Sequence, residues 1–121
     1  MDALRLTLLA EQIATALPAS TQGQPFGEGT EVFKVVGKVF AIVGSRDNRP
    51  LVTLKCAPPH AEALVAQHPS VTPGYHMNKR HWISVIPGEE TTETLLEDLI
   101  GNSYDIVVAT LPRDRRPGRP V

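Results

Sequence analysis

The sequence has only one cysteine, Cys56, and it has no long apolar run. A single cysteine cannot form a disulfide within the chain. The N-terminal stretch LRLTLLAEQIATAL follows Asp2 and is interrupted by Glu11 and Gln12, which does not fit a secretory signal. No segment approaches the roughly 18 apolar residues of a membrane span. We therefore expect a cytoplasmic protein that has no disulfide and does not contact a membrane.

The sequence also lacks the strong motifs of enzymes and metal sites. It contains no P-loop, Rossmann glycine pattern, HExxH, CxxC, GxSxG or EF-hand motif. Cys56, His76 and His81 have no zinc-type spacing and no clear fourth ligand. Glu93 and Glu97 are one helical turn apart, which fits a solvated helix face better than a catalytic pair. We expect no enzymatic activity, no catalytic residue, no metal and no cofactor.

A chain of 121 residues with 41% hydrophobic and 21% charged residues is typical of one folded domain. We assign this single domain to residues 1–112. The remaining residues, 113–121, have no apolar pattern and are predicted to form a disordered basic tail. The arginines of this tail are Arg113, Arg115, Arg116 and Arg119.

Charge is distributed unevenly, although the formal net charge is only −1 and the pI is about 6.4. A nucleic-acid-binding domain recognised from total charge would have a pI above about 9. Residues 32–81, however, contain seven Lys or Arg and two acids, a balance of +5. Residues 89–105 contain six acids and no base. This distribution predicts one basic flank and one acidic helix.

Helical spacing of apolar residues predicts three helices. The first covers residues 3–17, with Asp2 as its N-cap. The second is opened by Pro58 and Pro59 and extends to Gln67. The third covers residues 91–111 and is expected to be kinked or split at Gly101-Asn102. Segment 18–30 is rich in Gly, Pro, Ser and Thr and is predicted to be a surface loop.

The stretch EVFKVVGKVFAIV, residues 31–43, predicts a hairpin with a type II′ turn at Gly37-Lys38. With Val36 opposite Val39, Phe33, Val35, Phe40 and Ile42 form an apolar face that must belong to the core. The other face is aliphatic with one lysine and suits a partly exposed sheet surface. It comprises Val32, Lys34, Val36, Val39, Ala41 and Val43.

Two further segments complete the predicted sheet. LVTLK, residues 51–55, is expected to be a strand with Thr53 and Lys55 on the same outer side as Lys34. Residues 73–88 predict a second hairpin with its turn near Asn78, and the pattern leaves open which way Trp82 faces. The expected fold is therefore α+β, a two-layer sandwich in which helices from both termini pack on one face of an antiparallel sheet of hairpins.

The candidate site is the basic stretch HMNKRHWISV, residues 76–85, with cations from the sheet. Lys79 and Arg80 at a hairpin turn can reach phosphates, and Lys34 and Lys55 could extend the same surface. Taken singly, each cation could equally serve to keep an edge strand soluble. Trp82 could be a core residue or could stack on bases. His76 and His81 could be packing residues or contacts.

Four segments in this order resemble the MmcQ/YjbR family, small bacterial proteins often described as DNA-binding: VFKVVGKVFAIV, LVTLKCAP, PGYHMNKRHWISV and LIGNSYDIVVATLP. The resemblance extends from about Pro25 to Pro112. It implies a frataxin-like (CyaY-like) or secretion-chaperone-like α+β fold, with Ser103 and Tyr104 tying the last helix to the sheet. The family-like residues on the proposed basic surface are Lys34, Lys55, His76, Asn78, Lys79, His81 and Trp82.

Two functions follow from these observations as hypotheses. The first is nucleic-acid binding, with duplex DNA as the expected partner. Lys34, Lys55, Lys79 and Arg80 would contact phosphates, and Trp82 or His76 would touch bases. The alternative is a protein-interaction or homodimerising domain without catalytic activity, which would use the aliphatic outer face of the sheet.

Overall fold

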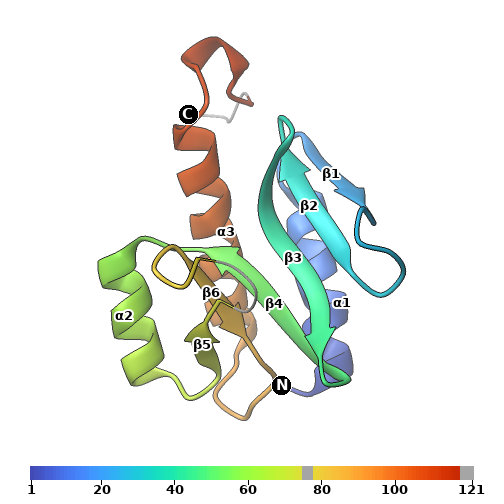
Figure 1. Cartoon of the computed structure of the whole chain (residues 1–121), viewed down its shortest axis with the longest axis vertical. Coiled ribbons are helices and arrows are strands. Elements are labelled where there is room, and N and C mark those ends of the chain that lie inside the picture. Colours follow the sequence, from blue (N-terminus) through green and yellow to red (C-terminus); the bar gives the residue numbers. More distant parts are fainter. Residues whose placement is uncertain (75–77, 118–121) are drawn as a thin grey trace.

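The computed structural model describes residues 1–74 and 78–117, and in this part of the chain it confirms the α+β fold. A six-stranded, fully antiparallel sheet has the strand order β1-β2-β3-β4-β6-β5. Helices α1 and α3 pack against each other and against the central strands, behind the sheet in Figure 1. The strands are β1 (Ser20–Gly23), β2 (Glu31–Val35), β3 (Lys38–Arg46), β4 (Arg49–Lys55), β5 (Val71–Pro73) and β6 (Trp82–Val85).

The helices are α1 (Ala3–Ala16), α2 (Pro58–Gln67) and α3 (Glu93–Ala109). The predicted N-cap of α1 is confirmed, because the Asp2 side chain accepts a hydrogen bond from the Arg5 N–H at 2.8 Å. The Thr92 hydroxyl caps α3 in the same way. Helix α3 is a single element through Gly101 and Asn102, so the predicted split is wrong. Among the described helices, none has the length and apolar content needed to cross a membrane.

The first hairpin is present, but its turn lies one residue earlier than predicted. Val35 is the partner of Lys38, so Val36 and Gly37 form the turn. Their φ angles of 48° and 78° are both positive, as a type I′ turn requires. The pairing of β2 with β3 then shifts between Phe33 and Lys34, which leaves Phe40 as an extra, bulged residue.

This bulge corrects the predicted faces of the hairpin. Phe33, Val35 and Phe40 belong to the core, as expected. Ala41 and Val43, expected on the outer side, are only 0% and 3% exposed and also pack in the core. Ile42, expected in the core, faces outward as the partner of Val32. The alternation was counted without the extra residue, which reverses the side chains that follow it.

Ser103 and Tyr104 tie α3 to the rest of the fold, as predicted. The Ser103 hydroxyl donates to the Phe40 carbonyl at 2.6 Å and accepts from the Lys55 N–H at 2.8 Å. These two backbone groups lie just beyond the end of the β3–β4 pairing, where the strands diverge in Figure 1. The Tyr104 ring packs edge-on against Phe40 at 5.3 Å, and its hydroxyl donates to the Pro18 carbonyl.

Two segments differ from or add to the sequence-based expectations. The predicted loop 18–30 contains β1, an edge strand in which Thr21 pairs with Lys34, so this part of the prediction is wrong. Within the segment assigned to the basic tail, Arg113–Arg115 form one 3-10 turn. The Arg116 guanidinium donates to the carbonyls of Ala109 and Leu111 and so satisfies the C-terminus of α3.

Candidate nucleic-acid interface

The candidate site lies on the sheet face opposite α1 and α3, which we call the outer face. Strand register identifies its residues, because directly paired residues of antiparallel strands share a face. Val32 pairs with Ile42, Ile42 with Thr53, and Thr53 with Ser84. Lys34 is two residues from Val32, and Lys55 is two residues from Thr53. The prediction that Lys34, Thr53 and Lys55 share the outer face is therefore confirmed.

Two outward cations were not predicted. Arg46 and Arg49 are direct cross-strand partners at the other end of β3 and β4, where Asp47 and Asn48 alone form the turn. The predicted strands covered residues 31–43 and 51–55, so both arginines were left outside the predicted sheet. The sequence did contain a signal for the outward direction of Arg49, because Arg49 alternates in phase with Thr53 and Lys55 along the same strand.

The pair formed by Arg46 and Arg49 lines a hollow of about 410 Å³. Like charges directly opposite each other on a sheet face repel, and the Asp47 carboxylate lines the same hollow. An anion held between two guanidinium groups would relieve the repulsion. The other residues lining the hollow are Asp47, Leu51, Thr72 and Ile86.

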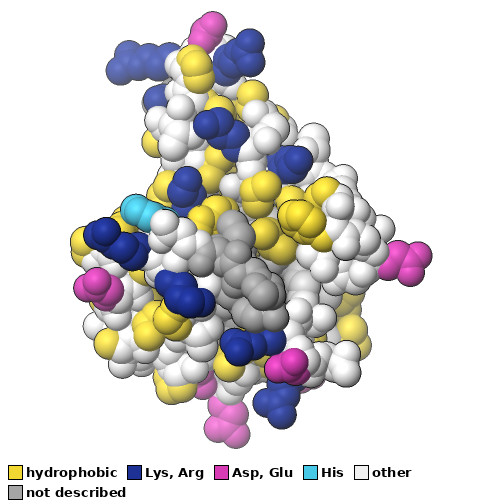
Figure 2. Space-filling model, in the orientation of Figure 1, with side chains coloured by type: hydrophobic (Ala, Val, Ile, Leu, Met, Phe, Trp, Pro, Cys, Tyr) yellow, Lys and Arg dark blue, Asp and Glu magenta, His cyan; other side chains and the backbone are white. Residues whose placement is uncertain are grey.

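The outer face carries positive charge without negative charge. Among the described strands, the outward positions include cations, and none of these positions is Asp or Glu. Figure 2 shows Lys and Arg side chains distributed from the top to the bottom of this side of the molecule, whereas most visible Asp and Glu side chains lie toward its margins. An ion pair on the helical side of the sheet joins Arg5 and Glu93 at 3.5 Å. The outward cations are Lys34, Arg46, Arg49 and Lys55.

Trp82 belongs to the outer face and not to the helix-facing core. It pairs with Lys55 across β4 and β6, and the Lys55 ammonium lies 5.9 Å from the centre of the indole ring. Ile83 and Val85 take the alternate positions and are buried against the helices. Trp82 is only partly buried. The question that the sequence pattern left open is thus answered.

The segment between β5 and β6 presents the remaining candidates. Asn78 shapes its turn, since its side chain accepts from the Arg80 N–H and its carbonyl accepts from the His81 N–H. Lys79 donates to the Gly74 carbonyl at 3.3 Å. Asn78, Lys79, Arg80 and His81 are all exposed. His76, also a predicted site residue, lies outside the described residues.

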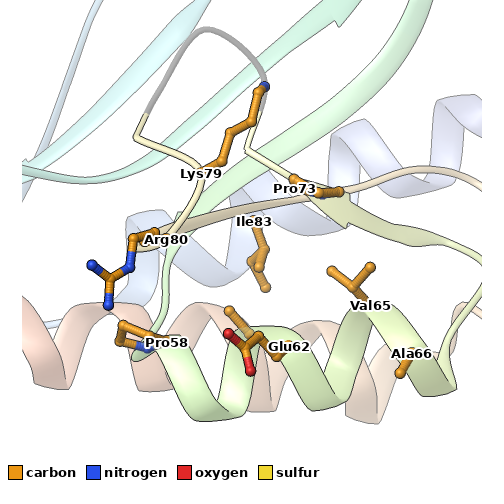
Figure 3. Close-up of a pocket in the computed structure, with 9 residues that line it drawn as sticks. Pro58, Glu62, Val65, Ala66, Pro73, Lys79, Arg80 and Ile83 are labelled. Carbon is orange, nitrogen blue, oxygen red and sulfur yellow. The ribbon is translucent and has the colours of Figure 1, made fainter.

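Lys79 and Arg80 adjoin a different surface from Lys34 and Lys55. They line a hollow of about 300 Å³ between this hairpin and α2. Figure 3 shows Ile83 between the hairpin and the helix, Arg80 extending toward Pro58, and Lys79 pointing away from α2. The structure therefore brings Lys55 and Trp82 together and places Lys34 on the same face, two strands away on β2. Lys79 and Arg80 follow on the hairpin next to α2.

The described residues include neither a reactive thiol nor a metal-binding group. Cys56 is buried, and burial raises the pKa of its thiol, which keeps it protonated and unreactive. Among the described residues, no group of His, Cys, Asp and Glu could hold a metal ion. Thr53 and Ser84 are hydrogen-bonded to each other at 2.9 Å and buried, whereas the outward cations, Trp82, Val39 and Ile42 keep some exposure on this face.

The family model described as YjbR matches residues 15–106. The uncharacterised protein YbdF of Escherichia coli O157:H7 is 43% identical over 121 residues and covers 99% of both chains. The uncharacterised protein YjbR of Escherichia coli K12 is 34% identical over 105 residues, which are 87% of this chain and 89% of that protein.

Two solved structures share the fold. The Deinococcus radiodurans protein DR2400, a DUF419 family-model domain, superposes with a TM-score of 0.78 at 32% identity, over 88% of this chain and 81% of that chain. A protein from Pseudomonas syringae superposes with a TM-score of 0.67 at 21% identity, over 88% and 98% of the two chains. The second likeness concerns the fold alone.

Proposed function

The chain belongs to the YjbR family, and from this premise and the charge of the outer face we propose that it binds nucleic acid through the phosphate backbone. The observation that carries the proposal is that the outward strand positions hold Lys34, Arg46, Arg49 and Lys55 and no carboxylate. Contacts of Lys and Arg with phosphates supply most of the sequence-independent affinity for nucleic acid, because they release condensed counterions.

The separation of charges within the molecule supports the proposal despite the net charge of −1. The exposed acids Glu93, Glu97, Asp98 and Asp105 lie on α3, which packs on the opposite side of the sheet. A polyanion approaching the outer face therefore meets cations first, and the acidic helix turns away from it. Such a charge dipole orients the encounter and raises the association rate at low salt.

The two ends of the face have different parts in the proposed contact. At one end, Lys34 and Lys55 each present a flexible point charge that can follow a phosphate. At the other end, Arg46 and Arg49 can bind phosphate oxygens with two parallel hydrogen bonds each. Arg80 extends the contact toward α2, and Lys79 adds a cation on the side of the hairpin that faces away from α2 (Figure 3).

The test is a set of single alanine variants of Lys34, Arg46, Arg49 and Lys55, with binding of a fluorescently labelled oligonucleotide followed by anisotropy. Each variant is expected to weaken binding severalfold at about 50 mM salt. Each should also lower the slope of log K against log salt by about 0.7–0.9, the value for one lost phosphate contact.

The matched control is Arg5→Ala, which removes the same charge from α1 on the opposite side of the sheet. Its ion pair with Glu93 is exposed, so its loss has little effect on stability. This variant should bind as the wild type does. Equal losses for Arg5→Ala and Lys55→Ala would mean that total charge alone is responsible, and no binding at low salt would refute the proposal.

The competing function is a protein-interaction or homodimer interface on the same face. It has less support than the sequence suggested, because Ala41 and Val43 belong to the core. The aliphatic side chains that keep some exposure there are Val36, Val39 and Ile42, and Lys34 lies among them.

A further inference from the structure

Resting on the proposed function, we infer that the outer face binds a single strand, with one unpaired base stacked on Trp82. Trp82 is the chain's only tryptophan, and it lies on a sheet face that neither α1 nor α3 covers. An aromatic ring on an open antiparallel sheet, with lysines beside it, can stack a base while the lysines contact the flanking phosphates.

Trp82 is held in place by its backbone on both sides. On one side it pairs with Lys55 of β4. On the other, its carbonyl accepts from the Gly74 N–H at 2.9 Å. The backbone at Gly74 and the backbone at Trp82 approach closely. A Cβ at position 74 would lie 2.6 Å from the Trp82 Cβ, so only glycine fits there. A residue whose backbone is already fixed loses less conformational freedom when a base stacks on its side chain.

Lys55 lies over the ring that the base would use. Its ammonium is 5.9 Å from the ring centre, within cation–π distance. The lysine side chain is flexible and can turn from the ring to a phosphate when nucleic acid arrives. By this movement Lys55 would both uncover the Trp82 ring and bind a phosphate of the strand whose base stacks there.

A duplex fits this arrangement less well than a single strand. Its bases are already paired and stacked, so contact with Trp82 would require a base to be extruded at an energetic cost. A single strand presents unstacked bases and a flexible backbone. Lys55 and Arg49 lie six residues apart on β4, about 20 Å at 3.3 Å per residue, and a flexible strand can follow the face between them.

The experiment uses the intrinsic fluorescence of Trp82, because all tryptophan emission of the chain comes from this residue. Unlabelled ten-nucleotide oligo-dT, oligo-rU and a DNA duplex of the same length are titrated separately at low salt. The inference predicts that the single strands quench the emission and bind more tightly than the duplex. The dT and rU titrations show whether the strand is DNA or RNA.

Two variants test the ring itself by anisotropy with labelled oligo-dT. Trp82→Ala should weaken single-strand binding between about fivefold and about 150-fold, the range for one stacked base, while duplex binding changes little. Trp82→Phe keeps an aromatic ring and should retain most of the affinity for oligo-dT. This variant still tests the role of the ring if the alanine variant does not fold. The matched control is Phe26→Ala, because Phe26 is 72% exposed in the loop between β1 and β2.

The outcomes separate this inference from the proposed function. Duplex binding as tight as single-strand binding, with unchanged Trp82 emission, would overturn the inference and leave phosphate-backbone binding in place. Wild-type affinity of both Trp82 variants for oligo-dT would overturn it as well. Failure of both duplex and single strand to bind at low salt would overturn the proposed function together with the inference.

Discussion

At the scale of single residues, the Ser103 hydroxyl bridges two backbone groups of β3 and β4 that are not hydrogen-bonded to each other. The pairing of β3 with β4 ends at Ala41 and Leu54, so the Phe40 carbonyl and the Lys55 N–H are not paired with each other. The Ser103 hydroxyl satisfies both, since it can donate one hydrogen bond and accept another. It also fixes the backbone of Lys55, whose side chain belongs to the outer face. The core and the candidate interface are coupled at this hydroxyl.

Replacing Ser103 with alanine should therefore destabilise the fold strongly. The change leaves two backbone groups unpaired in an interior site, which costs about 1–3 kcal/mol for each group. We expect the free energy of unfolding to fall by about 2–4 kcal/mol, measured by urea denaturation. Ser45→Ala, the same substitution at an exposed position of β3, should change it by less than about 0.5 kcal/mol. Equal effects of the two variants would contradict the bridging role.

Individual residues of the interface could be predicted from the sequence only where a strand pattern was unambiguous. Lys34 and Lys55 were placed on one face because each alternates with buried aliphatic residues. The direction of Trp82 could not be predicted, since its neighbours on both faces are similarly apolar. Arg49 was missed because the predicted strand began at Leu51, whereas β4 begins at Arg49 and only two residues separate it from β3.

At the scale of elements, the turn between β2 and β3 carries an unusual residue. Val36 has a φ of 48°, a left-handed conformation that β-branched residues rarely adopt. The type I′ turn favours Asn-Gly at these two positions, and here Gly37 is preceded by valine. The strain is tolerated because the flanking strands fix the turn. It lies next to Lys34 and Lys38, at the end of the face with the proposed phosphate contacts.

Val36→Asn should relieve this strain and stabilise the protein. Asparagine accepts the left-handed conformation, and Val36 is 40% exposed, so little apolar burial is lost. We expect the free energy of unfolding to rise by about 1 kcal/mol, measured by urea denaturation. The same substitution at Val39, within β3, should lower it because asparagine is unfavourable in a strand. A loss of stability at both positions would show that the turn is not strained.

Helices and strands could be predicted from the sequence where their buried side chains recur at regular spacing. Helices α1, α2 and α3 were predicted close to their observed bounds for this reason. Strand β1 was missed because it is short, polar and paired on one side only, so nothing in Ser20–Gly23 alternates. The predicted faces of β3 were partly reversed because the apolar pattern of residues 38–43 does not reveal the extra residue, Phe40. Its carbonyl is bound by Ser103 of α3, which is remote in sequence.

At the scale of the whole molecule, the two layers of the fold separate opposite charges. The helical layer carries the acidic surface of α3, and the sheet carries outward cations. The net charge of −1 therefore conceals a sheet face with outward cations. This separation favours a polyanion as the partner of the outer face, and it also disfavours association of that face with a second copy of itself.

We therefore expect the chain to be monomeric, with a mass of 13.1 kDa, in light scattering at low salt across a wide range of concentrations. A two-fold dimer through the outer face would bring Lys34, Lys55, Arg46 and Arg49 against the same residues of the second copy, with no strand carboxylate to neutralise them. Val36, Val39 and Ile42 also offer little of the roughly 1,200–2,000 Å² that a stable interface buries. If a dimer of twice this mass formed at low salt and Val36→Asp dissociated it, the outer face would be a protein interface, because the charge repulsion would have been outweighed by apolar contact.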